Sequence, residues 1–238
     1  MRIDRFLTEM GRGSRTEVKK LIAKQRVQVN GLAAADPGQK IDPGRDTVSL
    51  DGEDVSYAAF EYYLLNKPQG VISASKDLRD CRQVCVTDLI HTKKRQDLFP
   101  VGRLDKDTEG LLLITNDGAL AHRLLSPKRH VDKTYEVTLD GELTGEAVQR
   151  LCKGVDIGDD KPTLPCEITQ TGPGSCRITI REGRFHQIKR MFETENLHVT
   201  ALKRISMGPL RLDSELKPGE YRELTKEEHE ALGELMPE

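Results

Sequence analysis

The sequence predicts an α+β fold, with a small N-terminal helical and hairpin unit followed by a larger, mixed, mainly antiparallel β-sheet with flanking helices. Segments with strand character outnumber helical ones and often follow each other directly, which favours antiparallel pairing over a doubly wound parallel sheet. The length of 238 residues suits one large domain with a small accessory domain. We therefore expect a small domain at 1–54, a linker at 55–60 and a large domain at 61–238.

The small domain shows the signals of two helices and two strands. Apolar residues at helical spacing over 3–10 predict a first helix, which the glycines that follow should end. Ser14, with Glu17 three residues later, predicts a capping box at the start of a second helix. Residues 27–31 predict a strand entering an Asn-Gly hairpin, and residues 47–52 predict a second strand and its turn.

The large domain follows a polar, linker-like stretch at residues 51–60. Strands are expected at 62–66, 111–115, 134–139, 168–170, 176–181 and 199–205. Helices are expected at 119–125, 146–153, 186–195 and 226–235. No apolar run approaches the roughly 18 residues of a membrane span, and the N-terminus lacks a signal peptide pattern. We therefore expect a soluble, cytoplasmic protein.

Charge is distributed unevenly along the chain, although the net charge is only -2. Residues 1–26 carry eight basic and three acidic side chains, whereas residues 213–238 carry three basic and nine acidic ones. The low net charge therefore does not exclude a nucleic-acid partner, because the basic groups are concentrated in one segment.

The five cysteines are Cys81, Cys85, Cys152, Cys166 and Cys176. Their odd number and the lack of a CxxC pair argue against a disulfide framework and against a structural zinc site. Two of them, Cys81 and Cys85, could serve as metal ligands, but no second Cys or His pair with suitable spacing accompanies them. We expect free thiols and no metal.

Positive charge in the small domain is concentrated on its second helix. Arg15, Lys19 and Lys20 lie off the apolar face, and Arg26 follows the helix. The stretch SRTEVKKLIAKQRVQVNG, residues 14–31, resembles the S4 RNA-binding domain. This resemblance implies that these four side chains contact phosphates of folded RNA. A solvated charged face remains an alternative, as does a DNA-binding helix-turn-helix, which the hairpin supports poorly.

A loop at residues 102–110 is the first candidate for an active site. Its sequence, GRLDKDTEG, combines two glycines with closely spaced opposite charges directly before an apolar strand. Such a composition is typical of a tight loop, and functional residues are often found on loops of this kind. From the chemistry alone, Arg103 and Asp105 could equally form an ordinary surface ion pair.

The run GRLDKDTEGLLLITNDG, residues 102–118, resembles the signature loop of the small-subunit-type ribosomal pseudouridine synthases. Further stretches resemble the same family in the same order, namely LNKPQG (65–70), KTYEV (133–137), EGRFHQIKRMF (182–192) and LKPGEYRELT (216–225). The form GRFHQIKRMF resembles the enzyme that modifies position 516 of 16S RNA more than the 23S-specific relatives. The resemblance implies an isomerase that converts a uridine of ribosomal RNA to pseudouridine.

The resemblance also implies the residues that carry the chemistry. Asp105 matches the catalytic carboxylate, acting as nucleophile at C1′ or as base at C2′. Lys189 matches the cation that keeps this carboxylate ionised in a desolvated pocket. Tyr135 matches the tyrosine that holds the flipped uracil and takes part in proton transfer. Arg103 would fill the gap left by the flipped nucleotide or hold a phosphate.

Four further residues near these motifs have weaker assignments. His186, Gln187 and Arg190 are expected to contact RNA, although His186 could instead cap the helix at which it lies. Lys67 precedes Pro68 in a rigid turn, so we expect a structural or phosphate-contacting role rather than a catalytic one.

The implied reaction adds and removes no group, so we expect no cofactor and no metal. The expected partner is ribosomal RNA, with no membrane, and the expected state is a monomer. A non-catalytic S4-type RNA-binding protein is the competing interpretation, but it would have no reason to keep Asp105, Tyr135 and Lys189 together. An aspartate-nucleophile hydrolase would need a metal or phosphate loop with a second carboxylate, for which Asp107 is the only nearby candidate.

Overall fold

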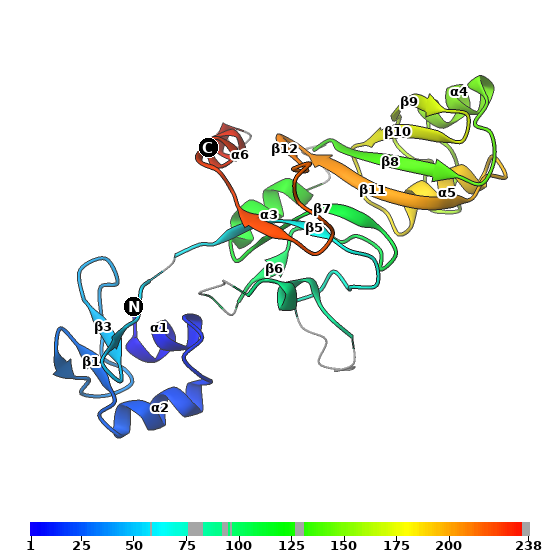
Figure 1. Ribbon diagram of the computed structural model, residues 1–238. Helices are drawn as coiled ribbons and strands as arrows, with labels where there is room; N and C mark the ends of the chain where they lie inside the picture. Colours follow the sequence, from blue (N-terminus) through cyan, green and yellow to red (C-terminus); the bar gives the residue numbers. More distant parts are fainter. Residues whose placement is uncertain (58, 76–82, 92–94, 96, 127–130, 235–238) are drawn as a thin grey trace. The chain divides into compact units, whose positions relative to one another are not determined.

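The computed structural model describes residues 1–57, 59–75, 83–91, 95, 97–126 and 131–234. The chain divides into two compact units (Figure 1). Unit 1 comprises Met1–Glu61 and His91–Leu98, and unit 2 comprises Tyr62–Ile90 and Phe99–Glu238. The second segment of unit 1 comes from within the stretch that the sequence assigned to the large domain, so our boundaries remain predictions.

Arg95 explains why the segment at 91–98 belongs to unit 1. Its side chain is 5% exposed, and its guanidinium forms an ion pair with Glu9 of the first helix at 3.0 Å. The same guanidinium contacts Asp97, while the backbone N–H of Arg95 donates to Glu61. A buried guanidinium needs such partners, because an unpaired charge in the interior is costly. Nothing in the local sequence pattern indicated the contact of Arg95 with Glu9, which lies 86 positions away in the chain.

Unit 1 contains two helices and a four-stranded antiparallel sheet in the order β2-β1-β3-β4. Its elements are α1 (Ile3–Glu9), α2 (Arg15–Ala23), β1 (Val27–Val29), β2 (Leu32–Ala33), β3 (Val48–Leu50) and β4 (Glu53–Asp54). The expected helices and the two expected strands are present. We did not expect β2 and β4, which have two residues each and therefore show no alternating pattern. The linker-like stretch that we placed at 51–60 thus begins with a turn and a short strand.

The local signals read from the sequence hold in unit 1. Ser14 Oγ accepts from the backbone N–H of Glu17, and the Glu17 carboxylate accepts from the backbone N–H of Ser14, so the capping box is complete. Asn30 and Gly31 both have positive φ, 52° and 80°, as a two-residue hairpin turn requires. The turn between β3 and β4 repeats this geometry.

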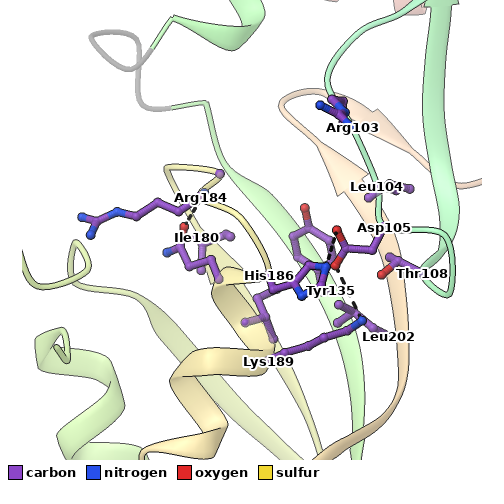
Figure 2. A pocket seen from close by; sticks show the side chains of 13 residues that line it. Arg103, Leu104, Asp105, Thr108, Tyr135, Ile180, Arg184, His186, Lys189 and Leu202 are labelled. Atoms are coloured by element: carbon purple, nitrogen blue, oxygen red, sulfur yellow. Dashed lines mark hydrogen bonds and ion pairs between the residues drawn. The ribbon is translucent and has the colours of Figure 1, made fainter. Parts of the chain in front are cut away.

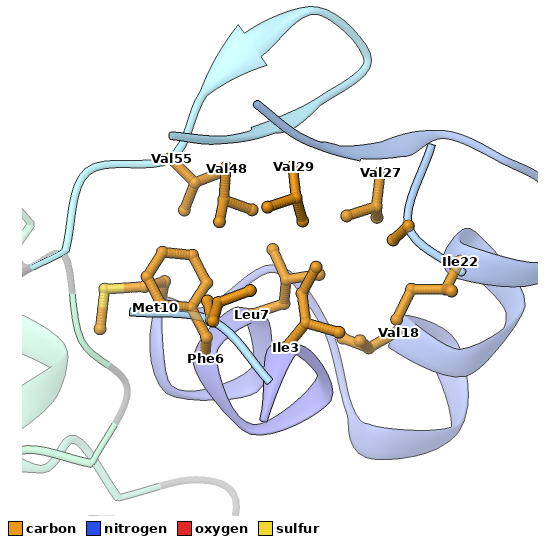
Figure 3. Packing of buried hydrophobic residues seen from close by; sticks show 12 residues of the cluster. Ile3, Phe6, Leu7, Met10, Val18, Ile22, Val27, Val29, Val48 and Val55 are labelled. Carbon is orange, nitrogen blue, oxygen red and sulfur yellow. The ribbon is translucent and has the colours of Figure 1, made fainter. Parts of the chain in front are cut away.

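The core of unit 1 lies between its two helices and its sheet. Figure 3 shows the side chains of α1 and α2 pointing toward a row of valines from the strands. The buried side chains include Ile3, Phe6, Leu7, Val18, Ile22, Val27, Val29 and Val48. The apolar face of each helix is therefore covered, and the opposite face of α2 is left to solvent.

Unit 2 is built on a nine-stranded sheet in which the longest path has the order β13-β5-β7-β11-β8-β10-β9. Its strands are β5 (Tyr62–Lys67), β6 (Phe99–Pro100), β7 (Glu109–Thr115), β8 (Lys133–Leu139), β9 (Glu167–Gly172), β10 (Ser175–Ile180), β11 (Val199–Met207), β12 (Leu210–Arg211) and β13 (Tyr221–Glu223). All described pairs are antiparallel except that of β7 with β11. The predicted α+β class with a mainly antiparallel sheet is confirmed.

Helices cover parts of this sheet. They are α3 (Gly118–Leu125), α4 (Gly145–Lys153), α5 (Gln187–Glu193) and α6 (Lys226–Glu234), with a short 3-10 helix, η1, at Val86–Leu89. All four predicted helices are present, although α5 is shorter than the predicted 186–195, and residue 235 of the last prediction lies outside the described residues. The short strands β6, β12 and β13 and the 3-10 helix were not predicted.

The α3 side of the sheet forms a hydrophobic cluster that fixes β7. Leu111 and Leu113 alternate along β7 and pack with Leu64 of β5, Leu120 of α3 and Leu232 of α6. Each of these side chains is at most 3% exposed. Figure 1 shows α3 lying against β5 and β7. This packing holds the strand that directly follows the 102–108 loop.

Gly110 brings the start of β7 against β11. It pairs with Arg204 in the parallel ladder between β7 and β11. Its φ is 103°, and a Cβ at this position would lie 2.3 Å from the Arg204 backbone oxygen. No side chain fits such a gap, so glycine is required here. Arg204 also donates from Nε to the carbonyl oxygen of Leu111 at 2.8 Å. The close approach places the 102–108 loop beside β8 and β11.

The structure can be compared with two further expectations from the sequence, on membrane-spanning segments and on the cysteines. Within the described residues, no helix combines the length and apolar character needed to cross a membrane. Cys152, Cys166 and Cys176 are free thiols, while Cys81 lies outside the described residues. Burial raises the pKa of Cys166 to about 12 and that of Cys176 to about 11. These two thiols are therefore protonated and unreactive at neutral pH.

Candidate active site

A pocket of 70 Å³ lies between the 102–108 loop, β8, β11 and the start of α5 (Figure 2). The residues that line it include Asp105, Tyr135, His186 and Lys189. Three of the four residues that the sequence assigned to catalysis therefore meet here, although 84 positions separate Asp105 from Lys189. The fourth, Arg103, lies at the edge of the same pocket.

Lys67 holds the loop that carries Asp105. Its side chain is fully buried, and Nζ donates to the carbonyl oxygens of Pro68, Lys106 and Thr108 at 3.0, 3.3 and 2.9 Å. Burial lowers the pKa of Lys67 to about 8, so the ammonium still carries its three protons at neutral pH and can serve all three acceptors. The buried position supports the structural role among the two that we considered, because this ammonium cannot reach a phosphate.

Ser73 stabilises the other side of the same loop through hydrogen bonds. Its Oγ donates to the carbonyl oxygen of Leu104 at 2.7 Å and lies 3.0 Å from the Leu104 backbone nitrogen, from which it accepts. Inside the loop, the backbone N–H of Thr108 donates to the carbonyl oxygen of Asp105. The backbone around Asp105 is thus held by bonds from both flanks, as positioning of a reactive group requires.

Two basic groups from α5 and its N-terminal end face the Asp105 carboxylate. Lys189 Nζ lies 3.6 Å from Oδ2 and His186 Nε2 lies 3.6 Å from Oδ1 (Figure 2). His186 has a left-handed backbone (φ 48°) and occupies the N-cap position, but its side chain makes no capping hydrogen bond. We had considered capping as its alternative role. The imidazole instead lies beside Asp105.

Lys189 makes a closer contact that the sequence did not indicate. Its Nζ lies 2.7 Å from each carboxylate oxygen of Asp107, nearer than it lies to Asp105. Lys189 lowers the pKa of Asp107, mainly through this hydrogen bond. The expected pairing of Lys189 with Asp105 is therefore incomplete, because two carboxylates share the ammonium. We had named Asp107 only as the second carboxylate of a hydrolase.

Tyr135 forms one wall of the pocket. It lies on β8 between Ile178 of β10 and Arg204 of β11, and only 7% of it is exposed. Figure 2 shows its ring close to the Asp105 carboxylate. A planar ring in this position can stack against a base that enters the pocket.

Arg103 precedes Asp105 by two positions but its side chain takes another direction. Figure 2 shows the Arg103 guanidinium apart from the Asp105 carboxylate. The side chain is exposed, and it forms no hydrogen bond or ion pair with any residue that the structure describes. The simple surface ion pair with Asp105, which the sequence left open, is not present. The guanidinium is available to a ligand.

Thr108 is a pocket residue that our sequence reasoning missed. Only 1% of it is exposed, and its Oγ1 is buried without a hydrogen-bond partner among the described residues. It lines the same pocket as Asp105. Buried hydroxyls normally find a partner, so an unpaired one at a candidate active site points to a group supplied by a ligand or water. Its place inside the 102–110 loop was the only signal in the sequence.

Two predicted RNA contacts at α5 are used inside the protein instead. The Gln187 side chain is 4% exposed; its amide nitrogen donates to Glu182 at 2.9 Å, and its amide oxygen accepts from the Arg184 backbone at 3.0 Å. Arg190 forms an ion pair with Asp159 at 2.6 Å and donates to the Phe185 carbonyl oxygen. Both side chains stabilise the segment before α5, because they form hydrogen bonds with backbone groups of Arg184 and Phe185. The contacts of Gln187 and Arg190 with RNA stay predictions.

The four basic residues predicted in the S4-like stretch fall into two groups. Arg15, Lys19 and Lys20 are exposed on α2 and form no ion pair within the described part of the chain. Arg26 instead binds Asp51 through two hydrogen bonds, the first from Nε at 2.7 Å. The pairing neutralises much of its charge, so Arg26 is a weaker candidate for a phosphate contact than the other three.

The described residues contain no group of three or more His, Cys, Asp or Glu side chains that could hold a metal ion. The pocket itself offers a carboxylate beside two basic groups, a buried tyrosine and a hydroxyl that has no partner among the described residues. Such a set can provide a nucleophile or base, a stabilising cation and a stacking surface.

Comparison with known proteins gives consistent matches over nearly the whole chain. Residues 61–194 match a family described as RNA pseudouridylate synthase, and residues 1–46 match the S4 domain. An uncharacterized RNA pseudouridine synthase of Bacillus subtilis is 48% identical over 98% of this chain and 99% of that protein. The ribosomal small subunit pseudouridine synthase A of Escherichia coli K12 is 37% identical over 96% of this chain and 98% of that protein. A crystal structure of a pseudouridylate synthase, 33% identical, has a TM-score of 0.69 and covers 98% of this chain and 99% of that chain.

Proposed function

This chain belongs to the RNA pseudouridylate synthase family and is an isomerase that acts on RNA, and from that premise we propose that its substrate is a uridine of small-subunit ribosomal RNA, at position 516 of 16S RNA. The proposed substrate is supported by the relative named ribosomal small subunit pseudouridine synthase A, which aligns over nearly its full length. The S4 domain match at residues 1–46 supports a second RNA contact outside the active site. A monomeric, cytoplasmic enzyme is part of the same proposal.

The observation that carries the proposed mechanism is the position of Asp105. Its carboxylate lies in the pocket with a basic group 3.6 Å from each oxygen, Lys189 on one side and His186 on the other. Conversion of uridine to pseudouridine breaks the bond between N1 and C1′ and joins C1′ to C5. The proton on C5 is lost and N1 gains one, so no atom is added or removed overall. The reaction needs no group donor.

Asp105 can begin this reaction in two ways. Attack on C1′ would displace the uracil and form an ester with the sugar, and removal of the proton at C2′ would expel the uracil and leave a glycal. Both routes require the ionised carboxylate. The Lys189 ammonium favours that form, because an opposite charge within a few ångströms offsets the loss of water around the carboxylate.

The other pocket residues have supporting roles in this proposal. Tyr135 would provide a flat surface on which the detached uracil is held while it turns, and its hydroxyl would take part in proton transfer. Asp107 accepts two hydrogen bonds from Lys189 and thereby orients the ammonium beside Asp105. Arg103, exposed and unpaired among the described residues, would hold a backbone phosphate or fill the space that the flipped nucleotide leaves.

A 23S-specific activity is the second candidate, because both kinds of enzyme belong to the same family. Carbodiimide primer extension on ribosomal RNA from a strain that lacks the gene would distinguish the two. We expect loss of one pseudouridine in 16S RNA, restored by the wild-type gene but not by the Asp105→Asn variant. An intact 16S pattern together with a lost 23S pseudouridine would replace the proposed substrate with the second candidate.

A further inference from the structure

Phe185 is an exposed aromatic residue next to the active site that the proposed mechanism does not use. Its side chain is 74% exposed, whereas most large apolar side chains of the described residues are buried. Its ring is stacked on that of His186, with centroids 3.9 Å apart and an angle of 16° between the planes. One ring face is therefore covered and the other is open to solvent. Keeping such a ring in water loses the stabilisation that its burial would give.

The segment that presents Phe185 is held firmly. The Phe185 carbonyl oxygen accepts from Arg190 at 3.1 Å, and the preceding Arg184 donates to Glu182 at 2.9 Å and to the carbonyl oxygen of Pro162 at 2.8 Å. The stack is thus attached to α5 on one side and to the 157–162 loop on the other. A fixed flat ring loses little conformational freedom when a ligand binds to it.

Phe185 borders a second cavity that opens beside the active-site pocket. We call it the side cavity; it has a volume of 460 Å³, and its wall includes Ser73, Lys106 and Phe185. Asp105, His186 and Arg103 line both the side cavity and the active-site pocket. Whatever occupies the side cavity therefore lies next to whatever Asp105 acts on.

The charges around the side cavity fit a polyanion. Arg103 and Lys106 are exposed there, and Arg103 has no ion pair within the described residues. Lys106 donates to the amide oxygen of Gln83 at 3.5 Å and, like Arg103, has no ion pair within the described residues. Arg184 also lines the cavity, but its guanidinium is taken up by Glu182 and by carbonyl oxygens. Two open cations beside a flat apolar ring match a phosphate followed by a base.

We infer that the Phe185 and His186 stack, together with the side cavity, binds the base of the nucleotide next to the target uridine. The neighbouring base stacks on the open face of Phe185, and Arg103 or Lys106 contacts the phosphate that joins the two nucleotides. Base flipping breaks the stacking between the target and its neighbour, and a new partner for the neighbour offsets part of that loss. A filled stack would also hold His186 against Asp105.

The inference rests on the proposed function only in requiring that the RNA be bound with the target uridine at Asp105. It differs from the earlier prediction of RNA contacts at His186, Gln187 and Arg190, because Gln187 and Arg190 are used internally. The ligand is a nucleobase held by its face, so the contact is expected to tolerate different bases. Stacking has little preference for sequence, since every base has a flat face.

Fluorescence of 2-aminopurine tests the inference directly. A short RNA that spans the modified uridine carries 2-aminopurine at either the 5′ or the 3′ flanking position, and the protein carries Asp105→Asn so that no turnover occurs. With Phe185 intact, we expect quenching at one of the two flanks on binding. Phe185→Tyr should retain the quenching, and Phe185→Leu, which stays apolar but lacks a flat ring, should lose it.

Binding measurements give the size of the contact. Loss of one stacked base weakens RNA binding by about 5- to 150-fold, and we expect this loss in Phe185→Leu but not in Phe185→Tyr. An abasic nucleotide at the same flank should weaken binding to wild type by a similar factor and should have no further effect on Phe185→Leu. Leu164→Ala is the matched control, because Leu164 is 38% exposed and lines neither cavity.

Two results would overturn the inference. One is quenching in Phe185→Leu that equals, at each flank, the quenching in the protein that keeps Phe185. The other is that Phe185→Leu and the abasic nucleotide weaken RNA binding independently, so that their two factors multiply. Thermal unfolding of each variant checks the fold, which the removal of an exposed ring should leave intact. Failure of the proposed substrate would show itself differently, as a wild-type enzyme that forms no pseudouridine in small-subunit RNA.

Discussion

Lys189 Nζ lies 2.7 Å from both carboxylate oxygens of Asp107, and this bidentate contact fixes the ammonium at 3.6 Å from Asp105. Side-chain exposure differs between the two carboxylates, at 67% for Asp107 and 29% for Asp105. Asp107 therefore faces solvent and orients Lys189, while Asp105 faces the pocket. The same ammonium serves one carboxylate as a hydrogen-bond donor and the other as a nearby charge.

Replacement of Lys189 tests this division. In Lys189→Met we expect a loss of single-turnover rate of at least 10-fold and an upward move of the acid limb of the rate profile, because Asp105 and Asp107 lose the ammonium that they share. Lys189→Arg should keep much more activity, because its charge is retained. Rates with saturating RNA between about pH 5 and 8 give the answer. A uniform loss at every pH with an unmoved limb, together with weaker binding, would instead assign Lys189 to a phosphate contact.

The lowered pKa of Asp107 adds a stability effect with a defined direction. A carboxyl whose pKa is lower in the folded state stabilises the fold above its ordinary value of 3.8, and this contribution is lost as the pH falls through the folded value. Wild type and Lys189→Met should therefore differ in stability near pH 6, and the difference should shrink as the pH falls below 3.8. Urea unfolding on both sides of this value measures the change.

Asp105→Asn should abolish turnover while leaving RNA affinity within a few-fold. The amide keeps the shape of the carboxylate but can act neither as nucleophile nor as base. Purified variant and wild type are compared in single-turnover assays on the same RNA, with binding measured separately. Substantial pseudouridine formation by the pure variant would remove Asp105 from its proposed role.

The sequence predicted the elements well because their signals are local. Ser14 and Glu17 made their capping box, and Asn30 and Gly31 made their hairpin turn, since each depends on neighbours within a few residues. Two-residue strands such as β2 carry no periodicity, so they could not be predicted. The contact of Arg95 with Glu9 joins residues 86 positions apart and left no trace in either local pattern.

The site was predictable in part, for a different reason. The resemblance of the 102–118 and 182–192 stretches named Asp105 and Lys189, and the structure brings the two together. Neither charge pattern nor resemblance indicated that Asp107 would be the closer partner of Lys189, because that depends on the curve of the loop. Gln187 looked like a polar residue for RNA, but α5 turns it inward to Glu182.

The salt dependence of RNA binding should distinguish the cations of α2 that have no ion pair among the described residues from Arg26, which is paired with Asp51. Lys19→Gln should lower the slope of log affinity against log salt by about 0.7 to 0.9, the effect of one lost phosphate contact. Arg26→Gln should lower the slope less, because Asp51 already neutralises much of the Arg26 charge. Filter-binding measurements between about 50 and 200 mM salt cover the useful range. Equal slopes for Lys19→Gln and wild type would locate the RNA contacts elsewhere.

Deletion of residues 1–54 is a coarser version of the same test. It removes all three open cations of α2 together, so RNA binding should weaken and its salt dependence should flatten. Unit 2 should still fold, since the hydrophobic cluster of β5, β7, α3 and α6 lies wholly within it. An unchanged slope after this deletion would contradict an RNA-binding role for the S4 domain.

Lys67 makes a prediction about stability at alkaline pH. Its pKa is lowered from 10.5 to about 8 by burial, so between these values the unfolded chain binds a proton that the folded protein does not. The free energy of unfolding should therefore rise with pH over this window, by up to about 3 kcal/mol for this group. Lys133 is also buried, with its pKa lowered to about 8, and adds a similar rise.

Lys67→Met isolates the contribution of Lys67. The variant should be less stable at pH 7, because the carbonyl oxygens of Pro68, Lys106 and Thr108 each lose a hydrogen bond from Lys67. Its stability should also rise less between pH 8 and 10 than that of wild type, since only Lys133 remains. Comparing the two proteins cancels the opposite effect of Cys166 and Cys176, whose pKa values are raised. Parallel curves of stability against pH would show that Lys67 keeps its ordinary titration.

Thr108→Val removes the hydroxyl of Thr108 but keeps the shape of the side chain, so it tests the role of the hydroxyl alone. Valine has nearly the same volume, and the hydroxyl has no partner among the described residues, so its removal should leave stability unchanged or raise it by about 1 kcal/mol. If the hydroxyl bonds to the nucleotide beside Asp105, the single-turnover rate should fall by about 10- to 100-fold, the effect of a hydrogen bond worth about 1.5 to 3 kcal/mol when one partner is charged. The backbone bonds of Thr108 to Asp105 and Lys67 are unaffected by the change.

Thr108→Ser gives the opposite combination and serves as the control. Serine keeps the hydroxyl but loses a buried methyl group, so it should cost about 1 kcal/mol of stability and retain most of the activity. A purely structural role for Thr108 would make activity follow stability, with the serine variant the less active of the two. A hydroxyl that contacts the nucleotide reverses that order, because activity then follows the presence of the oxygen. Single-turnover rates and urea unfolding of the two variants, measured side by side, distinguish these outcomes.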